Sequence, residues 1–128
     1  MEKKFLRTFN DTEVWWDEEN SVVRSHTSGL VDLEIAQWFY QQTVIFGNLF
    51  EHNVNWILDM SDIIKPTAKA RKTLTKAVGH ESVNKYALVG ASVLVRTVSN
   101  FILTAANQFN AKCFATDDEA IAWVHGED

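Results

Sequence analysis

The sequence contains a single cysteine, Cys113, so the chain cannot form an internal disulfide bond. A lone cysteine fits a reducing cytoplasm, where we expect the protein, and Cys113 is predicted to be a small core residue in a strand. Only one proline interrupts the chain and hydrophobic residues make up 46% of it, so extended disorder is not expected. No apolar run approaches the roughly 20 residues of a membrane-spanning helix. No apolar segment follows the basic pair near the N-terminus, so no signal peptide is predicted.

The motifs that announce most enzyme classes are also missing. The four histidines are far apart, and none has another histidine three or four residues away, so there is no zinc signature. The chain lacks the G-x-S-x-G, P-loop and G-x-G-x-x-G patterns. We therefore predict a protein that is not an enzyme and needs no cofactor. The net charge of −5 argues against general nucleic-acid binding.

What is present indicates one α/β domain over residues 1–128, the usual size of a single domain. Alternating apolar residues predict an antiparallel hairpin over 12–17 and 21–27, after a loosely held lead-in at 1–12. Short apolar strands separated by helices then predict parallel crossover connections. We expect a mixed sheet of about five strands flanked by about four helices, with the remaining strands mainly parallel. The further predicted strands are 55–60, 85–90 and 111–115, and the predicted helices are 32–50, 67–78, 93–107 and 117–124.

Two of the predicted helices carry more apolar surface than a helix on one face of a sheet needs. In the first, Leu33, Tyr40 and Val44 lie opposite the predicted core side. They are either scattered surface residues or a self-association surface, so a homodimer is possible. The helix 93–107 has only one charged residue, Arg96, which predicts deep burial.

The centre of interest is the end of the strand 55–60. Asp59, Ser61 and Asp62 cluster there, at the carboxyl end of a strand, where α/β folds usually meet their ligands and partners. Paired carboxylates can bind Mg²⁺ or act as acid and base, but no third ligand or nucleophile motif lies nearby. The favoured interpretation is structural, with Asp59 accepting hydrogen bonds from backbone N–H groups of the loop.

A strongly basic segment follows this loop. Lys65, Lys69, Lys72 and Lys76 recur at spacings of four, three and four, and Arg71 brings the segment to five positive charges with no acid. The remainder of the chain therefore carries −10. One interpretation is an ordinary amphipathic surface helix. The other is a surface that faces an anion, namely an acidic protein, a lipid headgroup or a phosphate.

Motifs along nearly the full chain, from about residue 13 to 124, resemble the small bacterial SpoIIAA-like proteins, also described as STAS or Sec14-like domains. Those motifs are Leu58-Asp59-Met60-Ser61, Ala70-Arg71-Lys72, Lys85-x-Ala87-x-Val89-Gly90-x-Ser92-x₃-Arg96 and Phe114-x-Thr116-x₂-Glu119-Ala120-x₂-Trp123. The resemblance implies a sheet flanked by helices and no catalysis. Characterised members are anti-sigma-factor antagonists and related regulators, which bind a kinase or switch protein at the start of the helix after the Asp-x-Ser strand.

In that family a serine within Asp-Ser-Ser-Gly is the phosphorylation switch, whereas this chain reads Lys65-Pro66-Thr67-Ala68. Thr67 is the only hydroxyl left in the matching region. The resemblance thus suggests a regulatory interaction module with its partner surface over 61–76. Sec14-like relatives suggest the alternative, a small carrier or sensor of an apolar, lipid-like molecule. The candidate partner-binding or switch residues are Asp59, Ser61, Lys65, Thr67, Lys69, Lys72 and Lys76.

Overall fold

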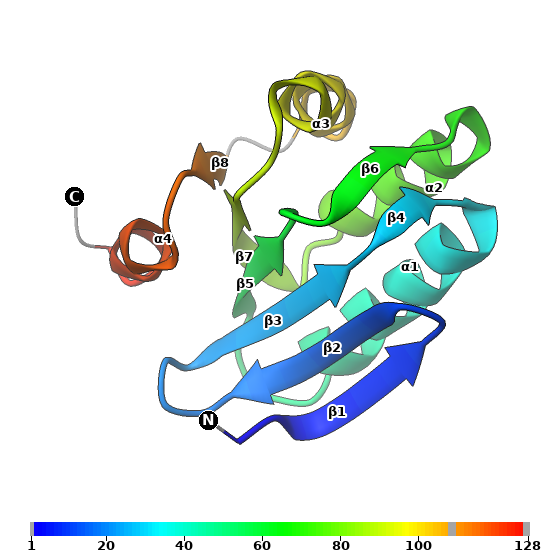
Figure 1. Cartoon of the computed structure of the whole chain (residues 1–128). Coiled ribbons are helices and arrows are strands. Elements are labelled where there is room, and N and C mark those ends of the chain that lie inside the picture. Colours follow the sequence, from blue (N-terminus) through cyan, green and yellow to red (C-terminus); the bar gives the residue numbers. More distant parts are fainter. Residues whose placement is uncertain (1, 108–109, 127–128) are drawn as a thin grey trace.

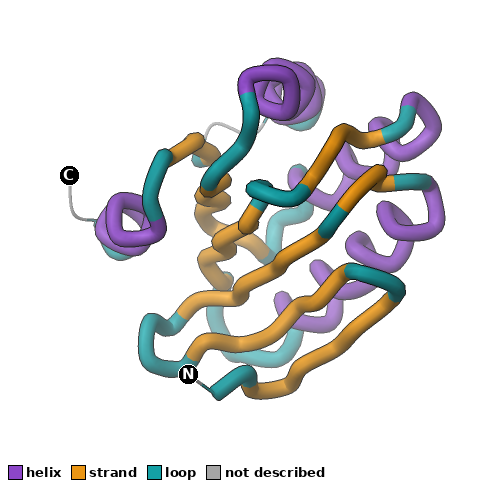
Figure 2. The backbone as a smooth tube through the Cα atoms, in the orientation of Figure 1, coloured by secondary structure: helices purple, strands orange, loops and turns teal. Residues whose placement is uncertain are grey.

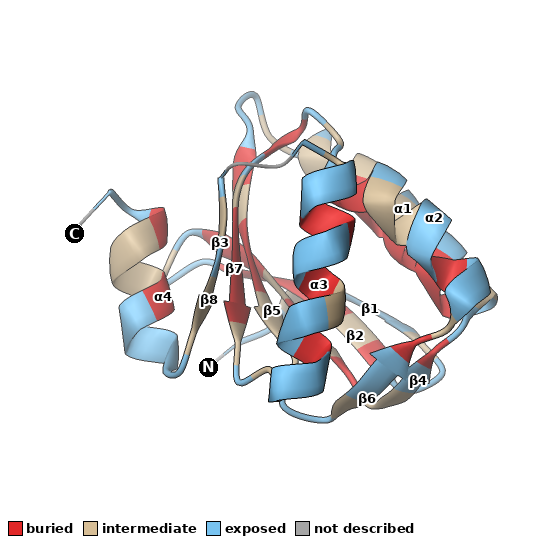
Figure 3. Cartoon of the chain, turned by 90° about the horizontal axis from the view of Figure 1, so that it is seen from above, coloured by how far each residue is buried: buried red, intermediate tan, exposed pale blue. Residues whose placement is uncertain are grey.

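The computed structural model describes residues 2–107 and 110–126 and shows a central six-stranded sheet in the order β1-β2-β3-β5-β7-β8. Three helices cover one face of this sheet and α4 lies on the other (Figures 1 and 3). A separate two-stranded sheet, β4-β6, extends from one end of the central sheet (Figure 2). The strands are β1 Lys4–Phe9, β2 Thr12–Asp17, β3 Val22–Thr27, β4 Gly29–Val31, β5 Val54–Asp59, β6 Ile63–Pro66, β7 Val83–Val89 and β8 Ala111–Phe114. The helices are α1 Leu33–Gly47, α2 Ala68–Val78, α3 Val93–Ala105 and α4 Asp117–Val124.

The predicted connectivity is confirmed. Strands β1, β2 and β3 pair antiparallel, and β3, β5, β7 and β8 pair parallel through helical crossovers. This arrangement places the ends of β3, β5 and β7 together at one edge of the sheet. The loop after Asp59 therefore lies at that edge, as the sequence predicts.

An aromatic core fills the space between the sheet and helices α1 to α3. Trp56 is fully buried, and its ring contacts those of Phe39, Phe46 and Tyr86. Its indole Nε1 donates to Ser25 Oγ at 3.0 Å, and Tyr86 donates its hydroxyl to the carbonyl of residue 77 at 3.1 Å. Burial raises the pKa of the Tyr86 hydroxyl far above its ordinary value. The two large polar aromatics thus have hydrogen-bond partners, as buried polar groups require.

A smaller core lies under α4 on the opposite face. Its buried residues are Val22, Ile57 and Ala87 of the sheet with Ala120 and Val124 of the helix. At the C-terminal end of α4, Lys85 Nζ donates to the carbonyl of residue 123 and Asn55 Nδ2 donates to the carbonyl of residue 124, both at 3.0 Å. These donors satisfy carbonyls that a helix end leaves without intrahelical partners.

The secondary structure differs from the prediction in several places. The prediction of a loosely held lead-in at 1–12 is wrong, because residues 4–9 form the edge strand β1. Most residues of this strand are exposed, so they give no alternating pattern. The two short strands β4 and β6 occupy segments predicted as a strand break and a loop. Strand β1 brings the central sheet to six strands where about five were expected, and α1 ends at Gly47 instead of residue 50.

The helices bury less, and in different places, than predicted. The expected deep burial of α3 is wrong, because Val93, Leu94 and Phe101 have exposed fractions of 71%, 56% and 72%. Conversely, Leu33, Tyr40 and Val44 of α1 are partly buried. Tyr40 packs on the main core, and its ring meets that of His80 just beyond α2. The homodimer stays a prediction. The argument for it is weaker, because Leu33, Tyr40 and Val44 are partly buried within the chain itself.

Replacing Gly47 with alanine distinguishes packing from helix propensity, because the two effects change the free energy of unfolding in opposite directions. A Cβ placed on Gly47 would lie 2.2 Å from both Cβ and Oγ of Ser82. Gly47→Ala should therefore destabilise the fold by about 1–3 kcal/mol through overpacking, although alanine is normally the better helix former. Chemical denaturation measures the change. The double variant Gly47→Ala/Ser82→Gly should recover stability relative to the single variant, and a single variant more stable than the natural protein would contradict the close contact.

Candidate functional site

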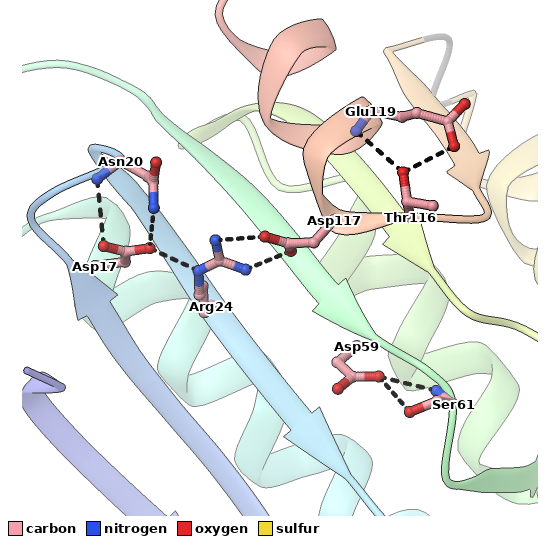
Figure 4. Close-up of polar contacts among 8 residues, drawn as sticks. All are labelled: Asp17, Asn20, Arg24, Asp59, Ser61, Thr116, Asp117 and Glu119. Atoms are coloured by element: carbon pink, nitrogen blue, oxygen red, sulfur yellow. Dashed lines mark hydrogen bonds and ion pairs between the residues drawn. The ribbon is translucent and has the colours of Figure 1, made fainter. Parts of the chain in front are cut away.

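The loop after β5 is organised by Asp59. Its Oδ1 accepts hydrogen bonds from the backbone N–H of Ser61 at 3.0 Å and from Ser61 Oγ at 2.6 Å (Figure 4). This confirms the structural interpretation of Asp59 as an acceptor of loop donors. Asp62 is engaged separately, with its Oδ2 2.6 Å from Nε2 of His26. Among residues 2–107 and 110–126, no group of three or more His, Cys, Asp or Glu side chains could hold a metal ion.

The short sheet β4-β6 fixes the segment between this loop and α2. The backbone N–H of Gly29 donates to the carbonyl of Asp62, and the N–H of Thr67 donates to the carbonyl of Val31, both at 2.9 Å. Lys65 therefore lies on an ordered strand, where it is exposed, and not in a free loop. The strand delivers the chain directly into the first turn of α2.

Thr67 begins α2 as its N-cap residue. Its Oγ1 accepts the N–H of Ala70 at 3.3 Å, and the first turn of the helix contains no acidic residue. Ala70 and Ala77 are fully buried on the inner side of the helix. The predicted amphipathic pattern is thus confirmed.

The lysines Lys69, Lys72 and Lys76 are all exposed on the outer side of α2. Together with Lys65 they leave the positive charge of this segment facing solvent. The structure thus brings the strand-end loop, a helix N-terminus and the lysines onto neighbouring elements. A helix N-terminus bordered by lysines favours a negatively charged group. We call the residues Asp59, Ser61, Lys65, Thr67, Lys69, Lys72 and Lys76 the basic face.

The structure also shows a polar cluster that the sequence reading missed, on the α4 side of the sheet. Arg24 Nε donates to Asp17 Oδ2 at 2.7 Å, while Nη1 and Nη2 donate to the two carboxylate oxygens of Asp117 at 2.7 and 3.0 Å (Figure 4). Asp17 also accepts two hydrogen bonds from Asn20. The β2-β3 register could have placed Asp17 near Arg24. Asp117 is 93 residues away from Arg24, and no pattern in the sequence indicates that the two residues meet.

The charges in this cluster are largely compensated. Burial alone would raise the pKa of Asp17, but the hydrogen bonds from Asn20 and Arg24 outweigh it and lower the pKa. Burial opposes the charge of Arg24 in the same way, and its bonds to Asp117 and Asp17 raise its pKa. A cavity of about 430 Å³ adjoins the cluster, lined in part by Trp15, Arg24, Asp59 and Asp117. Because two carboxylates already occupy Arg24, this cavity offers no free cation to an anionic ligand.

The apolar interior tests the carrier alternative. Two cavities of about 70 Å³ each lie between the sheet and helices α1 to α3. Ligand pockets usually measure about 300–1,000 Å³. Cavities this small do not hold a lipid-like molecule, which disfavours an apolar carrier. Both are lined by Phe39, Leu58, Met60, Leu74, Ser99 and Ile102.

Comparison with known proteins places the chain in a family. The model of the family "Domain of unknown function (DUF7793)" matches residues 16–126. The chain belongs to the DUF7793 family. No curated protein matches the sequence. Within the described residues, none of the helices is long and apolar enough to cross a membrane.

Solved structures show the fold of this DUF7793 member. One similar structure is an uncharacterised protein of the DUF3478 family with a SpoIIAA-like fold from Shewanella loihica PV-4, with a TM-score of 0.61 and 13% identity. That match covers 96% of this chain and 98% of the other. Another is the anti-sigma factor antagonist SpoIIAA in its unphosphorylated form, with a TM-score of 0.50, 18% identity and coverage of 94% and 96%. The chain therefore has the SpoIIAA-like fold that its motifs resemble.

Proposed function

We propose that this protein is a non-enzymatic regulatory module that binds a protein partner through the basic face. The observation that carries the proposal is the exposed row of lysines on β6 and α2, which begins beside the strand-end loop and contains no acid. The same fold in an anti-sigma factor antagonist supports a regulatory role. The partner is of the kinase or switch-protein class, with an acidic contact surface.

Charge reversal on the basic face tests this proposal. We expect Lys69→Glu/Lys72→Glu to abolish partner binding, because unlike charges across the interface become like charges. Tagged full-length protein, captured with its partners from the cells that make it, would be compared by quantitative mass spectrometry. The matched control is Arg7→Glu/Lys112→Glu, which makes the same change in net charge at exposed residues of β1 and β8. Partners retained by the first variant, or lost equally from the first variant and the control, would overturn the proposal.

Phosphorylation of Thr67 is the proposed gate of this surface. A phosphate there adds nearly two negative charges next to Lys65 and Lys69 and at a helix N-terminus, which alters the charge that the partner meets. Thr67→Asn removes the phosphate acceptor while keeping a good helix cap, unlike alanine, which would cost about 1 kcal/mol of cap stability. The variant should bind the partner at wild-type strength and no longer respond to the kinase. A binding curve that still shifts after kinase treatment would eliminate Thr67 as the gate.

A further inference from the structure

Helix α3 presents apolar side chains to solvent that the fold itself does not use. Its inward residues Val95, Ser99, Ile102 and Leu103 are buried. Leu94 and Phe101 have exposed fractions of 56% and 72%, and Val98 between them is only partly buried. Clustered exposed apolar residues of this kind mark interaction sites more often than single ones do.

These residues form one flank of the helix. Leu94, Val98 and Phe101 recur at spacings of four and three, which places them on one side of an α-helix. Arg96 is about 200° around the helix from Leu94. Arg96 lines a surface cavity with Cys113 and Phe114 of β8, so the apolar flank faces away from β8. Figure 3 shows α3 between β8 on one side and α2 with β6 on the other.

Strand β6 lies next to α3 and carries another exposed apolar residue. This strand contacts α3, as does α2, and Ile64 on β6 has an exposed fraction of 60%. The apolar flank of α3 therefore lies close to α2 and β6. An apolar strip next to a second helix is the setting in which proteins receive an amphipathic helix, through side chains at three- and four-residue spacings.

The charged residues of β6 and α2, the two elements next to this strip, are all positive. Residues 63–78 contain Lys65, Lys69, Arg71, Lys72 and Lys76, and neither this segment nor residues 91–107 contain an aspartate or glutamate. Asp62, just before β6, lies with its Oδ2 2.6 Å from Nε2 of His26. A second copy docked by the same surface in a symmetric dimer would set like charges against like, which is unfavourable. A complementary partner must therefore combine apolar residues with acids.

We propose that Leu94, Val98 and Phe101 of α3, with Ile64 of β6, form a docking surface for an amphipathic helix of a partner protein whose apolar stripe is bordered by Asp and Glu. This inference rests on the proposed function and extends the partner surface from the basic face onto α3. The apolar strip provides the anchoring contacts, and the five cations of β6 and α2 select an acidic partner and orient it.

Site-specific photo-cross-linking tests the surface directly. Benzoylphenylalanine replaces Phe101, or the exposed Ala68 between Thr67 and Lys69 of the basic face, or Thr8 on β1 as a distant exposed control. The full chain is used, inside the cells that make it. After irradiation, mass spectrometry identifies the cross-linked peptide. From Phe101 we expect a peptide of another protein with apolar residues at helical spacing and an excess of acids. Adding Leu94→Glu should lower the yield about tenfold, because an unpaired carboxylate is costly to bury, while Asn100→Glu, the same charge change elsewhere on α3, should leave it unchanged.

Each other outcome is decisive. A cross-link from Phe101 to a second copy of this chain, to a lipid, or to a segment without an acidic excess overturns the docking surface. A cross-link from Ala68 without one from Phe101 overturns it too, but leaves the proposed function standing. A cross-link from neither position, or equal yields from Thr8, overturns both. A cross-link from Phe101 alone removes the basic face from the interface, and therefore overturns the proposed function and the docking surface that extends it.

Discussion

Replacing Trp56 with alanine should lower the free energy of unfolding by about 3–5 kcal/mol, the cost typical of deleting a large buried aromatic side chain. Trp56 is fully buried at the centre of the main core. Its ring meets those of Phe39 at 5.4 Å, Tyr86 at 6.1 Å and Phe46 at 6.2 Å between centroids. These neighbours come from α1 and β7, so the substitution removes contacts that join the sheet to its helices. Urea denaturation followed by circular dichroism measures the loss.

Trp56→Phe is the matched control. It keeps most of the apolar contact but deletes the indole N–H that donates to Ser25 Oγ at 3.0 Å. We expect a smaller loss than for alanine, of which about 1–3 kcal/mol reflects the unpaired buried hydroxyl. Ser25→Ala in the Trp56→Phe background should recover part of it. A Trp56→Ala protein within about 1 kcal/mol of the natural one would contradict the central role of this ring.

Replacing Arg24 with alanine should cost about 3–5 kcal/mol, because it strips the partner from a buried carboxylate. The side chains of Arg24 and Asp17 have exposed fractions of only 12% and 1%. The substitution also releases Asp117, the first residue of α4, from its two hydrogen bonds to the guanidinium. The loss should therefore appear in global denaturation and also as faster hydrogen exchange in α4. Asp17→Asn/Arg24→Ala should be more stable than Arg24→Ala alone, since it removes the unpaired charge.

The effect of Arg24→Ala should depend on pH. In the natural protein the pKa of Asp17 lies below its ordinary value of 3.8, because the hydrogen bonds from Asn20 and Arg24 outweigh burial. The stabilisation from this carboxylate is thus complete above about pH 3.8 and fades as the pH falls through the lowered pKa. Without Arg24, the hydrogen bonds from Asn20 remain but the hydrogen bond and charge of the guanidinium are lost, so the pKa of Asp17 is higher than in the natural protein. The stability difference between variant and natural protein should therefore shrink on acidification, and a difference that is constant from pH 7 to 3 would contradict this account.

The sequence predicted secondary structure well where one side of an element is buried and the other is exposed to solvent. The inward alanines and outward lysines of α2 show this. The strand ending at Asp59 is buried on both faces, and its continuous apolar run indicated it instead. Edge strand β1 gave no signal because its backbone pairing holds mostly exposed side chains. Strands β4 and β6, of three and four residues, are too short for any period to show.

The sequence was least informative about contacts across long separations and about exposed apolar residues. Arg24 and Asp117 meet only because the Arg24 side chain points to the face of the sheet on which α4 begins, which no local pattern encodes. The scarcity of charge in α3 predicted burial, yet Leu94 and Phe101 are exposed. An uncharged helix can be buried by its own fold or reserved for a partner, and hydrophobicity alone does not separate these cases.

The ribbon formed by β4 and β6 makes the starts of two helices mechanically dependent. Val31 immediately precedes Asp32, the cap of α1, and its carbonyl accepts the N–H of Thr67, the cap of α2, at 2.9 Å. A force that moves the first turn of α2 must either break this bond or carry β4 and the cap of α1 with it. While this bond holds, a displacement of Thr67 also moves the cap of α1, one of the helices that cover the aromatic core.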